Sequence, residues 1–228
     1  MCIPANDVYT DWIVRITKAT PAEEGDGGDE GDGGEDEKDP YTLRIFAEDL
    51  GSISSSDFDF NDVVFDVWLD QTTKPGKTVA HIRLLAAGGI YPVWIGQMGD
   101  EYEIHKLLGV SESYGTYQMI NTGNGTLEKD PVEYPVELDR VIYSEKDVPI
   151  YVQQPQHKGE FWVLQAPYGQ TPQKIGVPVF TPWSLEYVNL NESYPSFNSW
   201  VTNLFPVDWT NVNREEKNLY KGLPKYWK

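Results

Sequence analysis

The sequence is poor in the residues that build several common kinds of site. Its 228 residues include one cysteine, Cys2, so no internal disulfide can form. The three histidines, His81, His105 and His157, lie far apart, with no second His or Cys at ligand spacing. A zinc site needs such a cluster, and a serine hydrolase of the common type needs a G-x-S-x-G turn, which is absent. We therefore expect neither.

Long apolar runs and basic stretches are also missing. No run approaches the roughly 18 to 20 residues that span a bilayer, and no secretion signal opens the chain. With 36 acidic and 18 basic residues the formal net charge is −18, which argues against nucleic acid and anionic membranes as partners. The opening "MCIPANDVYT" resembles the interior of a longer protein. We therefore expect a trimmed or C-terminal fragment.

Half of the net charge lies in one tract, residues 23–39, which has ten acidic residues and one lysine. A Gly-Asp-Glu tract has no apolar side chain to bury and repels itself. We predict a disordered surface loop there, inserted between the first two strands.

The rest of the chain predicts a β protein. Apolar residues make up 39% and aromatics 13%, which is enough for a substantial core. Short β-branched or aromatic segments are bounded by Gly, Pro, Asn or Asp, as strands are. They are residues 11–17, 41–50, 62–70, 78–89, 90–96, 134–143, 148–153, 160–167 and 173–180. We predict a single, mainly β domain over residues 1–228: an antiparallel β-sandwich or jelly roll in which 11–17 and 41–50 form a hairpin.

Two segments predict short helices instead. Residues 100–110, "DEYEIHKLLGV", can form one that stops at Gly109. Residues 194–205 place Phe197, Trp200 and Val201 at helical spacing after a plausible N-cap at Ser196. We expect the second helix to plug one end of the sandwich.

The segment "DFDFND", residues 57–62, is the main candidate site. Apolar residues are even-numbered at Phe58 and Phe60 but odd-numbered from Val63 onward, with Asp66 facing away from the core. Because side chains alternate faces along a strand, the backbone must bulge or turn near residues 61–62. Such a turn makes oxygen donors converge, and Ca²⁺ collects six to eight hard oxygen ligands.

The predicted ligands are Asp57, Asp59, Asn61 and Asp62, with Glu48 and Asp49 closing the shell from the end of the preceding strand. The D-x-D-x-N spacing matches the start of an EF-hand loop, but Asp62 and Trp68 stand where its glycine and bidentate glutamate belong. An EF-hand is therefore excluded. From the residues alone, a calcium loop and a solvated turn of Asp and Asn both stay open.

A family resemblance favours the calcium loop. The segments "LRIFAEDLGSISSSDFDFNDVVFDV", "IRLLAAGGIYPVWIG", "EIHKLLGV", "MINTG", "DVPIYV", "PQKIGVP" and "YPSFNSWV" together span roughly 70% of the chain. In this order they resemble LruC-type domains, which have largely unknown function and occur in surface proteins of Bacteroidetes. The resemblance implies an extracellular, cell-surface or periplasmic location and a calcium loop at the same six residues. The chain departs from the family in "GGIYPVW" and in the acidic insertion.

Two functions of different classes follow. The first is a non-catalytic, calcium-stabilised surface module for adhesion, glycan contact or envelope-protein assembly, whose glycan or protein partner the sequence does not name. The second is a carbohydrate-active hydrolase with aromatic subsites and an acidic pair. Of the tryptophans, we expect Trp209 and Trp227 to be exposed.

Overall fold

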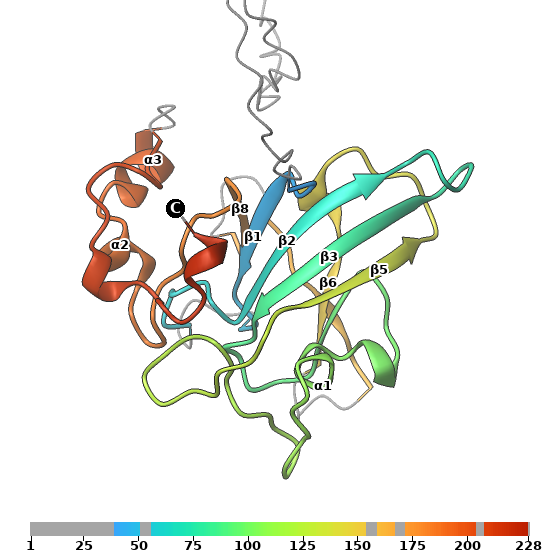
Figure 1. The fold of residues 1–228 in the computed structure, drawn as a ribbon, viewed down its shortest axis with the longest axis horizontal. Coiled ribbons are helices and arrows are strands. Elements are labelled where there is room, and N and C mark those ends of the chain that lie inside the picture. Colours follow the sequence, from blue (N-terminus) through green and yellow to red (C-terminus); the bar gives the residue numbers. More distant parts are fainter. Residues whose placement is uncertain (1–38, 51–55, 154–158, 167–171, 204–207, 228) are drawn as a thin grey trace, which may run out of the picture. The chain divides into compact units, whose positions relative to one another are not determined.

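The computed structural model describes residues 39–50, 56–153, 159–166, 172–203 and 208–227 (Figure 1). The chain divides into two compact units, residues 1–38 and 39–228. The first unit lies outside the described residues, and with it the predicted strand at 11–17 and nearly all of the acidic tract. Both stay predictions. The description that follows concerns the second unit by itself.

Two antiparallel sheets form the framework. The larger has the strand order β5-β3-β2-β1-β8 and the smaller has the order β4-β6-β7. The strands are β1 (Leu43–Ala47), β2 (Val63–Asp70), β3 (Thr78–Ala86), β4 (Val93–Ile95), β5 (Val132–Leu138), β6 (Ile150–Val152), β7 (Trp162–Val163) and β8 (Lys174–Val177). The prediction of a mainly β, antiparallel sandwich is confirmed.

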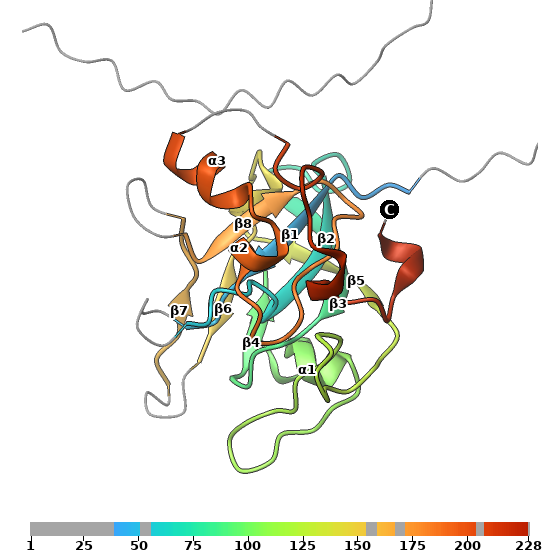
Figure 2. The same ribbon diagram turned by 90° about the vertical axis from the view of Figure 1, so that its left-hand side faces the viewer.

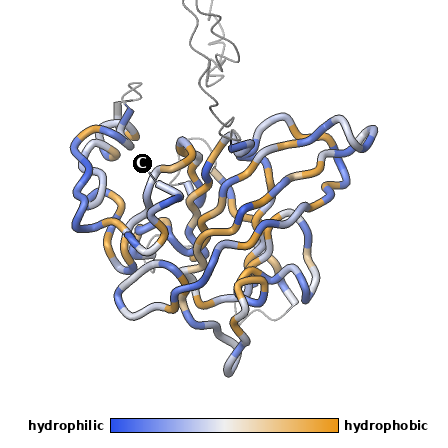
Figure 3. Tube along the Cα trace, in the orientation of Figure 1, coloured by the Kyte–Doolittle hydropathy of each residue, from blue (hydrophilic) through white to orange (hydrophobic). Residues whose placement is uncertain are grey.

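The alternation in the strands fixes the core between the sheets. Val63, Phe65 and Val67 of β2 are fully buried there with Val93 of β4 and Ile150 of β6. Figure 3 shows hydrophobic positions concentrated along the strands. Burying this apolar surface is the main driving force for closing the two sheets on each other.

The opposite face of the larger sheet is buried as well. A second core there joins Phe46 of β1 and Val64 of β2 to Trp183 and Tyr220 from the C-terminal part of the chain. Asp66 faces away from the core between the sheets, as predicted, but the face on which it lies is covered. Its side chain is fully buried and accepts from Arg44 Nε at 2.6 Å and Arg83 Nη2 at 2.6 Å.

The helices are short. They are α1 (Ile104–Leu107), α2 (Leu190–Ser193) and α3 (Phe197–Asn203), with 3₁₀ turns η1 (Asp100–Tyr102), η2 (Glu145–Asp147), η4 (Glu216–Asn218) and η5 (Pro224–Tyr226). The two predicted helices are present, and α2 is additional. Among the described residues no helix combines the length and apolar character needed to cross a bilayer.

The position of α3 corrects the prediction that it plugs an end of the sandwich. Phe197 packs in the second core, edge-to-face with Phe60 at 6.4 Å and with Trp209 at 4.9 Å. The helices α2 and α3 thus belong to the cover over the outer face of the larger sheet (Figure 2). Trp209 was expected at the surface, but it is only 5% exposed because it packs against Phe197 in this second core.

The predicted hairpin between residues 11–17 and 41–50 involves residues outside the described part of the chain and stays a prediction. Strand β1 pairs with β2 along one edge and with β8 along the other. Both hydrogen-bonding edges of β1 are therefore paired within the described residues.

Candidate metal centre

Strand pairing explains why acidic residues from two segments meet. In the antiparallel pair β1–β2, Ala47 lies opposite Val63. Glu48 and Asp49, which follow β1, therefore lie beside Asn61 and Asp62, which precede β2. The end of the preceding strand thus brings Glu48 and Asp49 to this loop, while their role as metal ligands stays a prediction.

The predicted change of faces occurs through left-handed backbone. Phe58 and Phe60 have φ values of 62° and 57°, a region that residues with a side chain rarely adopt. The turn buries Phe60 in the second core and also leaves Asp59 only 1% exposed. The prediction placed the turn near residues 61–62, and the structure places it slightly earlier, at Phe58 and Phe60. Such strain persists only where the surrounding structure holds it.

Three of the predicted ligands converge. Carboxylate oxygens of Glu48, Asp57 and Asp59 all lie within 4.8 Å of one another. The loop backbone holds two of these groups: Glu48 Oε1 accepts from the Phe60 N–H at 2.5 Å, and Asp59 Oδ1 accepts from the Asn61 N–H at 3.2 Å. Asp57 is exposed, so the group is open to solvent on one side.

The other three predicted ligands are buried beside this group. Asp62 Oδ2 accepts from the Asp49 main-chain N–H at 2.7 Å, and Asn61 Nδ2 donates to the Ser184 carbonyl at 3.2 Å. Among the described residues, Asp49 Oδ2 and Asn61 Oδ1 have no hydrogen-bond partner, although Asp49 and Asn61 are only 3% and 0% exposed. Buried polar oxygens without a partner are costly, and a cation or a hydrogen-bond donor would satisfy them.

Two glycines after β3 make room for these oxygens. A Cβ atom on Gly88 would lie 2.1 Å from Asn61 Oδ1, and one on Gly89 would lie 2.3 Å from Asp49 Oδ2. His105 fixes this turn, because its Nε2 lies 2.9 Å from the Gly89 carbonyl oxygen. His105 is fully buried, and its Nδ1 lies 2.8 Å from Glu103 Oε1.

Glu186 is a member of the cluster that sequence reasoning missed. Its Oε2 lies 3.0 Å from the same Gly88 Cβ position, which places it near Asn61 Oδ1. Thr122 Oγ1 donates to Glu186 Oε2 at 2.7 Å and orients the carboxylate. No local pattern marks Glu186, because only the packing of the C-terminal segment on the sheet brings it here.

The carboxyl groups of the cluster are buried close to one another, and this raises their pKa values. Burial, together with repulsion from neighbouring carboxylates, raises the pKa of Asp59 to about 9 and that of Glu48 to about 7. Burial is also the first cause of the raised pKa of Glu186, about 7, and of Asp49, about 6. The pKa of Asp62 is raised by burial and by Asp49.

Within the described part of the chain, no lysine or arginine forms a salt bridge with any of these carboxylates. Six carboxylates and an amide oxygen without a counter-ion match the hard oxygen donors that Ca²⁺ takes. The residues present therefore fit a calcium ion.

Comparison with known proteins bears on the fold. A crystal structure described as that of a "Putative lipoprotein from Bacteroides ovatus" is similar, with a TM-score of 0.50 and 15% sequence identity over 82% of this chain and 75% of that one. No family model matches the chain. No curated protein matches it either. The resemblance to LruC-type domains therefore stays a prediction, while the similar crystal structure supports the sandwich fold.

Proposed function

We propose that the chain is a non-catalytic, calcium-stabilised module of a cell-surface protein, serving adhesion, glycan contact or envelope-protein assembly. The observation that supports a bound metal most directly is a pair of buried oxygens without a hydrogen-bond partner among the described residues. They are Asp49 Oδ2 and Asn61 Oδ1, and they lie inside a cluster of carboxylates. A cation is the simplest group that satisfies both oxygens and neutralises the charge.

Glu48, Asp57 and Asp59 would supply ligands from one side, and Asp49, Asn61, Asp62 and Glu186 would complete the shell. Calcium suits the set better than magnesium, because it accepts more oxygens and tolerates irregular geometry. When bound, the ion supplies positive charge and nothing more. The stabilising effect comes from the contacts that the loop residues make with the rest of the protein.

The role of the ion would be structural. Asp59 and Asn61 contact both the loop and the C-terminal cover, through Tyr187 and Ser184. Neutralising the cluster removes the repulsion that opposes this contact. Calcium at a hundredfold excess over its Kd adds about 2.7 kcal/mol to the free energy of unfolding. The module would then keep its shape best outside the cell, where calcium is abundant.

The surface location has two supports. One is the similarity in fold to the Bacteroides ovatus protein described as a lipoprotein, and the other is the resemblance of the sequence to surface-protein domains. The hydrolase alternative gains no support from the described residues. The carboxylates with raised pKa converge on one another around buried oxygens, and the pocket described below contains none of them.

Metal content and thermal unfolding test the proposal. The purified chain should contain calcium by elemental analysis. Adding excess calcium to the EDTA-treated protein should raise its unfolding midpoint by roughly 5 to 10 °C. The reason is that about 1 kcal/mol of stability shifts the midpoint by 2 to 4 °C for a protein of this size. Asp57→Asn should abolish most of the shift. This variant is suitable because Asp57 is exposed and its loss leaves the core intact.

Asp130→Asn is the matched control, because Asp130 is exposed and lies outside the cluster. It should keep the full calcium response. The proposal would be overturned if the purified protein contained no metal and calcium did not change its unfolding midpoint. The cluster would then be a set of protonated carboxyl groups.

A further inference from the structure

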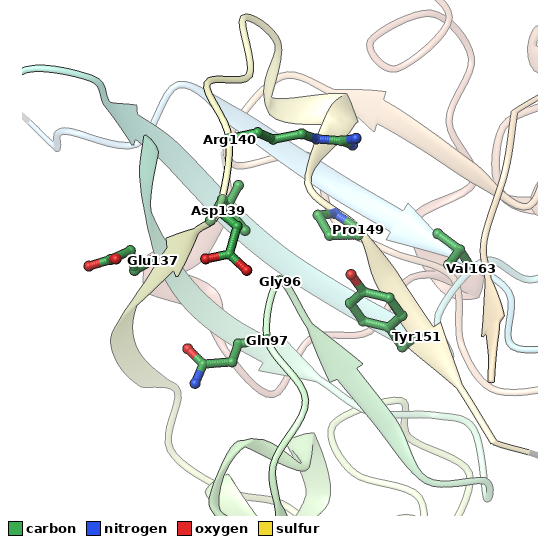
Figure 4. Close-up of a pocket in the computed structure, with 9 residues that line it drawn as sticks. Gly96, Gln97, Glu137, Asp139, Arg140, Pro149, Tyr151 and Val163 are labelled. Atoms are coloured by element: carbon green, nitrogen blue, oxygen red, sulfur yellow. The ribbon is translucent and has the colours of Figure 1, made fainter. Parts of the chain in front are cut away.

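A pocket separate from the acidic cluster opens where the end of β5 meets β4 and β6 (Figure 4). Its volume is about 760 Å³, within the roughly 300 to 1,000 Å³ of small-molecule sites. It shares no residue with the acidic cluster. Lining residues that bear on its chemistry are Gln97, Glu137, Asp139, Arg140, Tyr151 and Val163.

Tyr151 belongs to a row of side chains on the outer face of the smaller sheet. It pairs directly with Trp94 of β4 on one side and with Val163 of β7 on the other. Directly opposed residues of antiparallel strands point to the same face, and the next residue along each strand points to the other. Because Ile150 and Val152 are buried between the sheets, Trp94, Tyr151 and Val163 face outward.

Phe161 extends this row. Its ring packs edge-to-face on Trp94 with the centroids 5.5 Å apart. Phe161 is 40% exposed and Val163 is 38% exposed, so the row is open to solvent. The indole N–H of Trp94 donates to the Gly99 carbonyl at 2.7 Å, which holds the ring in place. The row is thus an ordered aromatic surface that leads to the pocket.

The polar side chains of the pocket carry little net charge. Glu137 is bound by Lys74 and by Lys77, whose Nζ lies 2.5 Å from Glu137 Oε1 and 3.6 Å from Asp139 Oδ1. Arg140 adds a guanidinium and Gln97 an uncharged amide at the pocket wall (Figure 4). Paired charges of both signs suit a ligand that is itself neutral and rich in donors and acceptors.

We propose that this pocket and the row of Trp94, Tyr151 and Phe161 bind a neutral glycan. Aromatic faces contact the C–H faces of sugar rings, while planar carboxylate, amide and guanidinium groups bond to pairs of hydroxyls. An anionic ligand would meet Glu137 and Asp139, and a cationic one would meet Arg140. The inference deepens the proposed surface role by naming its ligand class, and it does not depend on the metal.

The site binds its ligand without cleaving it. Cleavage of a glycosidic bond needs a carboxyl group that stays protonated near neutral pH. Hydrogen bonds from Lys74 and Lys77 lower the pKa of Glu137 to about 2, and Asp139 is fully exposed to water. Glu137 therefore does not hold a proton near neutral pH.

Affinity electrophoresis tests the proposal on the whole chain, in native gels that contain starch, xyloglucan, galactomannan or yeast mannan. We expect at least one of these neutral polysaccharides to retard the protein. Tyr151→Ala and Arg140→Ala should each lower the affinity for the polysaccharide, measured from the retardation, by roughly tenfold or more, as loss of a central contact does. Tyr114→Ala is the control, because Tyr114 is fully exposed and lies outside the pocket.

Three outcomes would overturn the proposal: no retardation by any of the four gels, retardation unchanged in both pocket variants, or retardation only in a polygalacturonate gel. Unfolding midpoints show whether Tyr151→Ala is folded, and Arg140→Ala keeps the test decisive if it is not. Each gel is run with calcium and with EDTA. Glycan binding that fails while calcium still stabilises the chain refutes this inference alone, whereas an absent calcium response refutes the metal proposal.

Discussion

The main-chain N–H of Tyr187 donates to Asp59 Oδ2 at 2.9 Å, although 128 residues separate the two in sequence. The Leu190 N–H donates to the Phe58 carbonyl at 2.7 Å beside it. The acidic loop and the C-terminal cover of the larger sheet are therefore joined at one point. Any ion bound to Asp59 would stabilise this junction as well as the loop.

Removing calcium should loosen the C-terminal cover. Without the ion, repulsion around Asp59 and Glu186 opposes the junction with Tyr187, so residues 183–203 and 208–227 should open locally more often. Limited proteolysis followed by mass spectrometry should show earlier cuts in this range in EDTA than in calcium. Cuts within β2 and β3 should not accelerate to the same extent. Equal cutting rates in both buffers would show that the junction does not depend on a cation.

Glu186→Gln should weaken calcium binding, because it removes one negative ligand while keeping the size of the side chain and its bond with Thr122. We expect a loss in affinity of at least about tenfold, as for supporting groups of metal sites. Isothermal titration calorimetry measures it. The matched control is Glu192→Gln, an exposed glutamate on α2. If the two variants bind calcium equally well, Glu186 is not part of the site.

Gly88→Ala should damage the same site from the opposite side. The new methyl group would lie 2.1 Å from Asn61 Oδ1 and 2.8 Å from the Asn61 carbonyl oxygen, so the loop must shift. Overpacking of this kind costs about 1 to 3 kcal/mol, measurable by urea unfolding. Gly99→Ala is the control, because its new contacts are chiefly with the flexible end of Glu101. Stability equal to that of the parent would argue against a rigid cradle at Gly88.

The stabilisation by calcium should grow with pH. Burial raises the pKa of Glu48 to about 7 and that of Asp59 to about 9, above the ordinary values near 4. A raised folded-state pKa gives stability that is present below the unfolded pKa and lost as pH rises through the folded value. The metal-free protein should therefore lose stability from about pH 5 to pH 9.

Calcium binds the ionised carboxylates and should reverse that loss. The calcium-induced rise in unfolding midpoint should be small near pH 5 and large near pH 8. Differential scanning calorimetry across this range, with and without calcium, gives both curves. A calcium effect independent of pH would contradict the assignment of Glu48 and Asp59 as ligands.

Asp66→Asn tests the fold independently of the site. Asp66 is fully buried between Arg44 and Arg83, with Nε–Oδ1 of the Arg44 pair at 2.6 Å. Removing the carboxylate takes the counter-charge from the buried Arg44, while Arg83 keeps its ion pair with Asp39, and breaking a buried pair costs about 3 to 5 kcal/mol. Chemical denaturation should show this loss with the calcium response retained. Asp130→Asn should have no such effect, and a loss below about 1 kcal/mol would refute the role of Asp66.

The sequence determined those features that depend on neighbours along the chain. Alternation at Val63, Phe65 and Val67 identified the strand and the face that packs between the sheets. The change of parity at Phe58 and Phe60 indicated a backbone turn, which the structure has. The oxygen donors of residues 57–62 were readable for the same reason, since a D-x-D-x-N spacing is local.

Only the tertiary structure decided which surfaces cover the rest. The burial of Asp66, the place of α3 and the presence of Glu186 in the cluster all follow from packing of the C-terminal segment on the larger sheet. No alternation within β2 distinguishes solvent from a cover contributed more than a hundred residues later. Likewise, the need for glycine at Gly88 arises from Asn61 on a neighbouring segment. Local pattern encodes which side chains share a face, whereas contact between distant segments decides what that face meets.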